Sequence, residues 1–460
     1  MILTVLSIAM ILYVALQLQD KFKIPSPLSL IVLSFVFHAI SNNLFLLTGD
    51  PEHFAKLVIL LLPILLIGDT LELRLADLKE HGLSLFYLAV VAVSLSVVVA
   101  LFSADYIFAE YQLSAAAIVM LFAMVLATDP VSVVSIFSNF ELPHKLKILA
   151  EGESLFNDAT ALIVFVFIGL YGLEGGVITT GYVTEISLVI IFASAAVGVA
   201  VGYIGLALMK TTENRISELL LLIMTGYGGF ELSEHFYAVL NLFGGHSHMH
   251  LSGILGCIFA TLTLHHNLTR NIQKEEELIE KEEEEIRQES KSAESSSSVI
   301  DSALSILKIN IEEKERHMRT KEDIQLLAIV ANTILFVAMA EIIDFELLLK
   351  YKFEIISMFL VTTVIRAGMM AKFAFITNQT NKMANVNYRW WGVLTFAGIK
   401  GGLSVVMLMM IPQGFDHIEM FKAVVVGVIL LSTFIYSTIL IVIIGKNSET
   451  FRKEMLEEGH

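Results

Sequence analysis

Apolar residues recur along this chain in runs of about 20, separated by short polar stretches. A helix of that length crosses the roughly 30 Å hydrocarbon core of a bilayer. By apolar length we predict about thirteen membrane-spanning helices, over residues 2–19, 27–47, 54–72, 83–108, 114–137, 146–172, 184–209, 216–235, 251–266, 323–343, 353–376, 389–412 and 417–445. The pattern therefore predicts an all-α polytopic membrane protein.

The basic residues of the loops predict its orientation. Every second predicted loop contains Lys or Arg, as at Lys21, Arg74 and Lys145, whereas the intervening loops at 109–113 and 173–183 contain neither. Lys and Arg mark the cytoplasmic side of a membrane protein. We therefore expect a multi-pass protein of the cell membrane with its N-terminus outside and its C-terminus in the cytoplasm.

Composition indicates the class of protein, whereas the net charge says little about partners. Of 460 residues, 56% are hydrophobic and 17% charged, and the mean hydropathy is +0.74, which indicates a membrane protein rather than a soluble enzyme. Much of the net charge of −16 comes from glutamate runs at 275–277 and 282–285, so the charge indicates no particular partner and no nucleic acid is expected. A single cysteine, Cys257, excludes an intramolecular disulfide.

The same features predict four parts along the chain. Residues 1–266 would contain spans one to nine, which are a first repeat and the start of a second. Residues 267–322 form a charged cytoplasmic insert. Spans ten to thirteen follow at 323–445, and residues 446–460 form a cytoplasmic tail.

A polar motif, Glu-Gly-Glu-Ser-Leu-Phe-Asn-Asp at 151–158, lies inside the apolar run from 146 to 173. A charged side chain at that depth costs roughly 2.5–3.5 kcal/mol on insertion scales. Such side chains face a protein interior or a water-filled path, so Glu153 and Asp158 are predicted to be functional. The alternative is an ion pair that only joins helices.

Two predicted spans also contain a helix break next to a charge. Pro130 should interrupt the span 114–137 at Thr128–Asp129, because proline removes a backbone donor. The glycines of Gly398–Gly402 should interrupt the span 389–412 around Lys400. Two discontinuous, crossing helices are typical of transporters built on inverted repeats, and Asp129 and Lys400 have the signs that offset helix ends. Simple kinks without a transport role are the alternative.

The spacing of the motif indicates an oxygen-rich site. Ser154 and Asp158 are four residues apart, share one helix face, and can both point towards Thr128. Glu153 needs a basic partner, and Arg366 is the candidate. Hydroxyl and carboxylate oxygens suit a small desolvated cation such as Na⁺, without the dense acidic cage that Ca²⁺ prefers. Asp158 could hold either a proton or that cation, which is the basis of exchange.

At these residues the chain resembles the NhaP-type sodium/proton antiporters of the monovalent cation:proton antiporter superfamily. The matching elements are Thr128-Asp129-Pro130, the block Gly152–Asp158, Arg366 and the stretch Gly398–Ser404, in the same order. The resemblance implies a homodimer with thirteen spans in each protomer, and a core of spans four to six and eleven to thirteen that moves against a dimerisation domain. It implies no cofactor besides the transported Na⁺ and H⁺.

The resemblance also implies roles for residues of the motif. Asp158 would be the shared carrier of cation and proton, Thr128 and Ser154 would be Na⁺ ligands, and Asn157 would organise the site. Asp129 is expected to belong to the same cation- and proton-binding group. An Asn-Asp pair resembles the electroneutral branch, which implies one-for-one exchange. The chain departs from the family in having lysine at 400, where many relatives have arginine, and in its long insert, so stoichiometry and regulation stay open.

Other readings remain. Exchange of K⁺ for H⁺, or a monovalent cation channel, would use similar buried oxygens. An intramembrane protease is a remote alternative, because Gly152-Glu153-Ser154-Leu155 lacks the glycine that follows a nucleophilic serine. Three alternating loop histidines could bind a metal, although simple solvation is the stronger reading; they are His246, His248 and His250.

Overall fold

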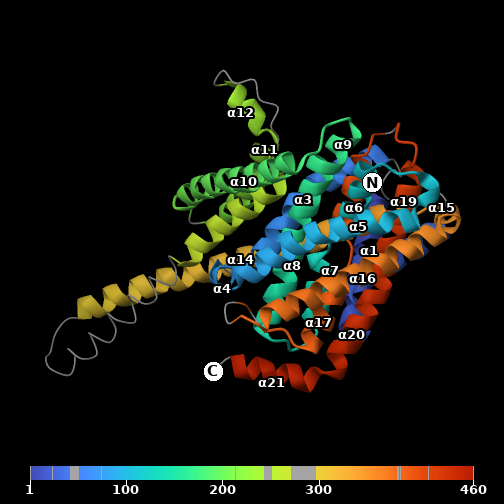
Figure 1. Cartoon of the computed structure of the whole chain (residues 1–460). Coiled ribbons are helices and arrows are strands. Elements are labelled where there is room, and N and C mark those ends of the chain that lie inside the picture. Colours follow the sequence, from blue (N-terminus) through green and yellow to red (C-terminus); the bar gives the residue numbers. More distant parts are fainter. Residues whose placement is uncertain are drawn as a thin grey trace. The chain divides into compact units, whose positions relative to one another are not determined.

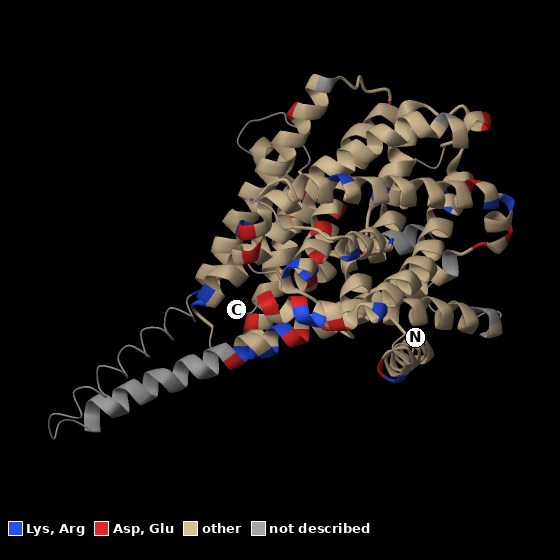
Figure 2. Ribbon diagram, turned by 60° about the horizontal axis from the view of Figure 1, so that its bottom comes forward, with Lys and Arg blue, Asp and Glu red and all other residues tan. Residues whose placement is uncertain are grey.

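The computed structural model describes residues 2–22, 24–41, 51–73, 75–212, 214–242, 251–270, 297–380, 383, 385–412 and 414–458. Every regular element among these residues is a helix, and eight helices are long and apolar enough to cross a membrane. Most of the helical ribbon in Figure 2 belongs to residues other than Lys, Arg, Asp and Glu. The predicted all-α polytopic fold is confirmed.

The chain divides into two compact units. Unit 1 comprises Met1–Leu62, Ala76–Val189 and Val330–His460, and unit 2 comprises Pro63–Leu75 and Ile190–Ile329. The whole polar motif and both predicted helix breaks belong to unit 1, so all the predicted site residues share one compact body.

Unit 1 begins with two apolar helices and continues through the helices of the motif to the end of the chain (Figure 1). Its elements, some shared with unit 2 at their ends, are α1 (Ile2–Phe22), α2 (Ser26–Ser41), α3 (Pro51–Thr70), α4 (Leu75–Phe86), η1 (Tyr87–Ala92), α5 (Val93–Ile107), η2 (Ala109–Tyr111), α6 (Ala115–Leu126), α7 (Pro130–Phe137), α8 (His144–Val164), η3 (Phe165–Leu170), α9 (Tyr171–Leu173), α15 (Phe345–Lys350), α16 (Lys352–Thr377), α17 (Tyr388–Phe396), α18 (Gly402–Met409), α19 (Ile418–Leu431), η4 (Ser432–Tyr436), α20 (Ser437–Lys446) and α21 (Ser448–Glu458).

Helix α6 lies in the centre of unit 1. The helix is apolar on every side, and all its residues from Ala116 to Leu126 are buried. A helix without a polar face must be surrounded by other helices or by lipid, and α6 is surrounded by protein. Thr128 and Asp129, which follow the C-terminal end of α6, therefore lie inside the unit.

The two predicted helix breaks are confirmed. The span predicted at 114–137 is divided into α6 and α7 by the extended residues 127–129. The span predicted at 389–412 is divided into α17 and α18 by residues 397–401. In each case the chain continues as a second half-helix beyond the break.

Unit 2 consists of long helices that continue into or out of unit 1. Its elements are the end of α3, most of α10 (Thr180–Met209), α11 (Arg215–Glu234), α12 (Phe236–Leu242), a helix over residues 253–270 and the first part of α14 (Ser297–Ile342). Helix α14 passes without interruption through residue 322, where the sequence predicts the charged insert to end and a span to begin. Part of that insert, residues 271–296, lies outside the described residues, as do His246, His248 and His250.

Charged residues join three helices of unit 2. The Glu218 carboxylate, on α11, accepts hydrogen bonds from Arg316 Nε (2.8 Å) and His317 Nδ1 (2.8 Å), both on α14. His265, in the helix over 253–270, lies with its Nδ1 3.1 Å from Nε2 of His317. Glu218 is only 2% exposed, so this group, which we call the Glu218 cluster, is an internal polar connection.

Candidate functional site

The first break follows from Pro130. Proline has no N–H, so the carbonyl of Leu126, four residues earlier, receives no helical hydrogen bond. The chain is extended at Asp129 (φ −112°, ψ 102°) and restarts as α7 with Pro130 in its first turn. The Asp129 carboxylate accepts the N–H of Val131 (3.2 Å) and the hydroxyl of Ser132. A carboxylate therefore caps the positive N-terminal end of α7.

The second break meets the first through the main chain. The N–H of Asp129 donates to the carbonyl of Ile399 at 2.7 Å. A Cβ atom at Gly401 would lie 2.5 Å from the Cβ of Asp129, so only glycine permits this approach. The N–H of Lys400 donates to Ser432 Oγ (3.1 Å), which ties the same break to η4.

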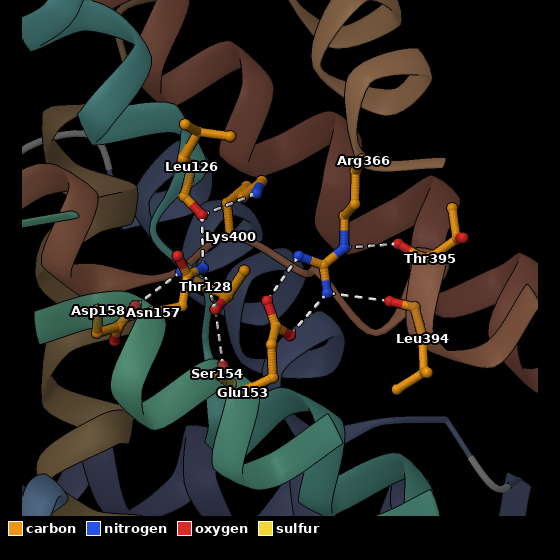
Figure 3. A network of polar contacts seen from close by, with 10 residues as sticks. All are labelled: Leu126, Thr128, Glu153, Ser154, Asn157, Asp158, Arg366, Leu394, Thr395 and Lys400. Atoms are coloured by element: carbon orange, nitrogen blue, oxygen red, sulfur yellow. Dashed lines mark hydrogen bonds and ion pairs between the residues drawn. The ribbon is translucent and has the colours of Figure 1, made fainter. Parts of the chain in front are cut away.

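Lys400 binds the carbonyl that Pro130 leaves without a donor. Its Nζ lies 3.3 Å from the oxygen of Leu126, and the side-chain amide of Asn157 donates to the same oxygen at 2.9 Å (Figure 3). Lys400 is 3% exposed. The negative C-terminal end of α6 thus faces a lysine and the positive end of α7 faces Asp129, in the arrangement that the charge pattern predicts.

Three residues of α8 converge on Thr128. Asp158 Oδ1 accepts the Thr128 N–H at 2.8 Å. Ser154 Oγ donates to Thr128 Oγ1 at 2.9 Å, and Asn157 Nδ2 donates to the same hydroxyl at 3.0 Å. These three residues lie within about one turn of α8 and are buried, so the helix brings their polar side chains to Thr128 (Figure 3).

Asn157 also presents an oxygen without a donor. Its amide nitrogen donates to both Leu126 and Thr128, whereas Oδ1 is buried and has no hydrogen-bond partner among the described residues. A buried acceptor left unsatisfied costs about 1–3 kcal/mol. A cation bound next to Asn157 Oδ1 would satisfy this acceptor, so the oxygen atoms of the site suit a positively charged ligand.

Arg366 joins three helices around Glu153. Its NH1 and NH2 groups donate to Glu153 Oε1 and Oε2 at 3.0 and 2.8 Å. Its Nε donates to the carbonyl of Thr395 (2.9 Å) and its NH2 also donates to that of Leu394 (3.0 Å). Figure 3 shows the guanidinium between the carboxylate of α8 and the last carbonyls of α17. Arg366 therefore pairs with an acid and also caps the negative end of α17.

The sequence identifies the side chains of this site but misses several partners. The Leu126 carbonyl could have been found, because Pro130 removes its donor. The Leu394 and Thr395 carbonyls and the Ser132 hydroxyl have no comparable sequence signal. Every predicted site residue makes one of the contacts described above; these residues are Thr128, Asp129, Glu153, Ser154, Asn157, Asp158, Arg366 and Lys400.

Comparison with known proteins decides the family. The family model described as "Sodium/hydrogen exchanger, transmembrane" matches residues 6–282, which is more than half of the chain. The chain belongs to the sodium/hydrogen exchanger family. Together with the relatives and the solved structure described next, this match confirms the resemblance to NhaP-type antiporters.

Two named members of this family show how far the likeness extends. The Na(+)/H(+) antiporter NhaH of Halobacillus dabanensis is 30% identical over 194 residues, which are 42% of this chain and 47% of the relative. The Na(+)/H(+) antiporter ApNhaP of Aphanothece halophytica is 24% identical over 453 residues, 96% of this chain and 74% of the relative. The chain thus spans about half the length of the first relative and three quarters of the second.

The exchanger fold covers nearly the whole chain. The solved structure of the sodium proton antiporter MjNhaP1 from Methanocaldococcus jannaschii superposes with a TM-score of 0.69, covering 95% of this chain and 99% of that one. At 14% identity this likeness shows a shared fold.

Proposed function

We propose that this chain is a secondary active antiporter that exchanges a monovalent cation, in the first place Na⁺, for H⁺ by alternating access. Asp158 is the shared site of the cation and the proton. The observation that carries the proposal is the convergence of Asp158, Ser154 and Asn157 on Thr128 at a break in a buried helix. The names of the antiporter relatives support the same activity.

The charges around Thr128 support competition between the two ions at Asp158. Glu153 is neutralised by Arg366, and Asp129 and Lys400 lie at the two ends of the first break. A cation that approaches the Asp158 carboxylate must replace a proton there, and a returning proton must displace the cation. Each half of the cycle then carries one positive charge, which gives the proposed one-for-one, electroneutral exchange.

Oxygen ligands for the cation come from α8 and from the break. Ser154 Oγ donates its hydrogen to Thr128 Oγ1 and keeps its own lone pairs for a cation. Thr128 Oγ1 accepts two hydrogen bonds, so it binds a cation only when Ser154 or Asn157 turns its donor away. The Asn157 Oδ1 atom is a further acceptor. We therefore assign Asp158, Ser154, Thr128 and the Asn157 oxygen as the oxygen ligands.

The remaining features of the protein follow from the same proposal. The protein is a transporter rather than an enzyme, and Ser154 is not a nucleophile activated by a base, because its hydroxyl hydrogen points to Thr128. It would be a homodimer in the cell membrane, with its N-terminus outside and its C-terminus in the cytoplasm.

Reconstituted vesicles test the activity directly. Purified protein is placed in proteoliposomes with a pH gradient, and dissipation of the gradient is followed after addition of Na⁺, K⁺ or Li⁺. We expect saturable exchange with Na⁺ for the wild type. Asp158→Asn should reduce exchange to the vesicle background with every cation, since an amide cannot release a proton.

The control is Glu174→Gln, which removes a carboxylate from an exposed position after α9. Exchange by Asp158→Asn at the control rate would contradict the proposal and move the carrier role to another acid, with Asp129 the next candidate. Current through single channels in planar bilayers would favour a channel, and a preference for K⁺ would change the transported cation.

A further inference from the structure

Helix α21 lies across the ends of other helices of unit 1 (Figure 1). It follows α20 after a turn at Asn447, whose side-chain amide donates to the carbonyl of Ile443 (2.7 Å) and whose own carbonyl accepts the N–H of Phe451 (3.0 Å). Phe451 is completely buried. The helix is therefore anchored to the unit by an apolar side chain as well as by its connection.

Glu454 of α21 binds the first residues of α17. Its Oε1 accepts Asn387 Nδ2 (3.1 Å) and Arg389 NH2 (2.5 Å), and its Oε2 accepts Trp390 Nε1 (2.9 Å). The oxygen of the Asn387 amide in turn caps α17 by accepting the N–H groups of Arg389 and Trp390, both at 3.0 Å. One carboxylate thus fixes the N-cap residue and the first turn of α17.

The same helix reaches the beginning of α8. The residue at the N-cap of α8 is Pro143, which makes no side-chain capping bond. Glu458 Oε2 accepts the N–H of His144, the first residue of α8, at 2.7 Å. Arg452 Nε lies 3.2 Å from Glu141 Oε2 just before that helix. These two contacts are exposed and contribute little individually, so Glu454 makes the main polar connection.

We propose that α21 is a brace for the transport core and that Glu454 is the positioning residue through which it acts. This inference rests on the proposed function. Helix α17 leads to the break at Lys400 and α8 carries Asp158, so α21 contacts the N-terminal ends of the two helices that supply opposite sides of the site. By holding the N-terminal ends of α8 and α17, α21 fixes the distance between Asp158 and the break at Lys400.

The length of α17 gives the size of the effect. From its N-terminus to the break is nine residues, or roughly 14 Å at 1.5 Å per residue. A tilt of about 4° at the N-terminus therefore moves the break by about 1 Å. A displacement of that size changes the distances from Lys400 and the second break to the oxygens around Thr128, and hence the affinity for the cation.

The test uses the tryptophan that Glu454 binds. The chain has two tryptophans, Trp390 and Trp391, so a Trp391→Phe parent leaves Trp390 as the only one. Glu454→Gln in this parent keeps the shape of the side chain and removes its charge. Glu457→Gln, exposed on the same helix, is the matched control. Each variant is assayed for Trp390 emission and for the apparent KM and maximal rate of Na⁺-driven proton movement in vesicles.

We expect Glu454→Gln to shift Trp390 emission to the red and to raise the apparent KM for Na⁺ by about twofold to thirtyfold, the range of couplings transmitted between distant sites. Glu457→Gln should match the parent in both. Glu454→Asp, which keeps the charge, should recover part of the affinity. An apparent KM for Glu454→Gln equal to that of the control would overturn the positioning role, whatever the emission.

Failure of the brace and failure of the proposed function give different results. If the parent moves no protons in response to cations, the exchange function fails and the positioning role fails with it, while the emission still reports whether α21 is docked. If Glu454→Gln does not accumulate, Trp390→Phe removes one of the three donors to Glu454 and is tested by KM alone. An apparent KM in Trp390→Phe equal to that of the parent would then overturn the role.

Discussion

Arg366 has two structural roles, of which the sequence predicts only the pairing with Glu153. It neutralises Glu153 through two hydrogen bonds, and it caps α17 through the carbonyls of Leu394 and Thr395. A buried pair contributes little net stability as a whole, but loss of one partner leaves an uncompensated charge at a cost of roughly 3–5 kcal/mol. Arg366 adds to this the donors to two carbonyls.

Replacing these residues by leucine should therefore have unequal effects. Glu153→Leu should destabilise the protein by roughly 3–5 kcal/mol, and Arg366→Leu should destabilise it further because two carbonyls of α17 lose their donors. The double variant should be far less destabilised than the sum. The measurement is thermal unfolding in detergent across the double-mutant cycle. Equal losses of stability in the two single variants would contradict the capping role of Arg366. A double variant whose loss equals their sum would contradict the pairing of Glu153 with Arg366.

The close approach at Gly401 gives a second prediction at this scale. Gly401→Ala would place a methyl group 2.5 Å from the Cβ of Asp129 and should force the two breaks apart, with loss of most exchange activity. The neighbouring Gly402→Ala is the matched control, because its Cβ would lie 3.4 Å from a Leu335 side-chain carbon. Vesicle exchange rates of the two variants are compared at equal protein levels. Similar rates would show that contact between the breaks is dispensable.

Side chains of the site could be predicted from the sequence to a far greater extent than their backbone partners. Glu153 and Arg366 are conspicuous because a charge in an apolar run needs a partner. The carbonyl of Leu126 is recognisable only through Pro130, and Lys400 could be placed near a helix end but not on that atom. Leu394 and Thr395 act through groups that every residue has, so no sequence pattern distinguishes them.

At the scale of elements, the Glu218 cluster is the clearest internal connection of unit 2. Glu218→Gln would remove the carboxylate that Arg316 Nε and His317 Nδ1 bind. Since hydrogen bonds to charged groups contribute about 1.5–3 kcal/mol and Arg316 is partly exposed, we expect a loss of about 1–3 kcal/mol, measured as a lower midpoint of thermal unfolding.

A control for this prediction lies on α14, the helix of Arg316 and His317. Glu315 pairs with Arg319 one turn away, and both side chains are more than half exposed. Glu315→Gln should change the midpoint by little, because exposed pairs contribute about 0–1 kcal/mol. If both variants shift the midpoint equally, the cluster does not join its helices more strongly than a surface pair.

Whole elements were harder to delimit than the breaks within them. Apolar length places the span that follows the insert at 323–343, yet α14 begins at Ser297. A charged sequence can also be helical, and in this part of α14 Arg316 and His317 bind Glu218 of α11. Trp390 is 6% exposed and donates to Glu454 of α21, a contact that the sequence does not predict. Partners separated by 64 or 98 residues leave no local pattern.

For the whole molecule, the distribution of charge predicts exchange without net charge movement. Glu153 and Arg366 form a neutral pair, and Asp129 and Lys400 offset opposite ends of the first break. If Asp158 alone alternates between a proton and a cation, the core has the same charge in both half-cycles. Exchange in vesicles should then proceed at one rate with or without a K⁺ diffusion potential set by valinomycin.

A rate that rises with the potential would mean that a second group changes its protonation during the cycle, and Lys400 and Asp129 would be the groups to replace first. Glu174→Gln, the exposed control, should show the same response to potential as the wild type. This experiment addresses stoichiometry separately from the identity of the cation.

The hydrogen bond from the Asp129 N–H to the Ile399 carbonyl joins the two breaks with main-chain atoms alone. Of the encoded amino acids, only proline at 129 would delete that donor. Side chains around the breaks, other than at Gly401, can therefore be exchanged to alter which ion is preferred while this main-chain hydrogen bond persists. Thr128, Ser154 or Asn157 could therefore be replaced to change ion selectivity, because none of these side chains takes part in the hydrogen bond that joins the two breaks.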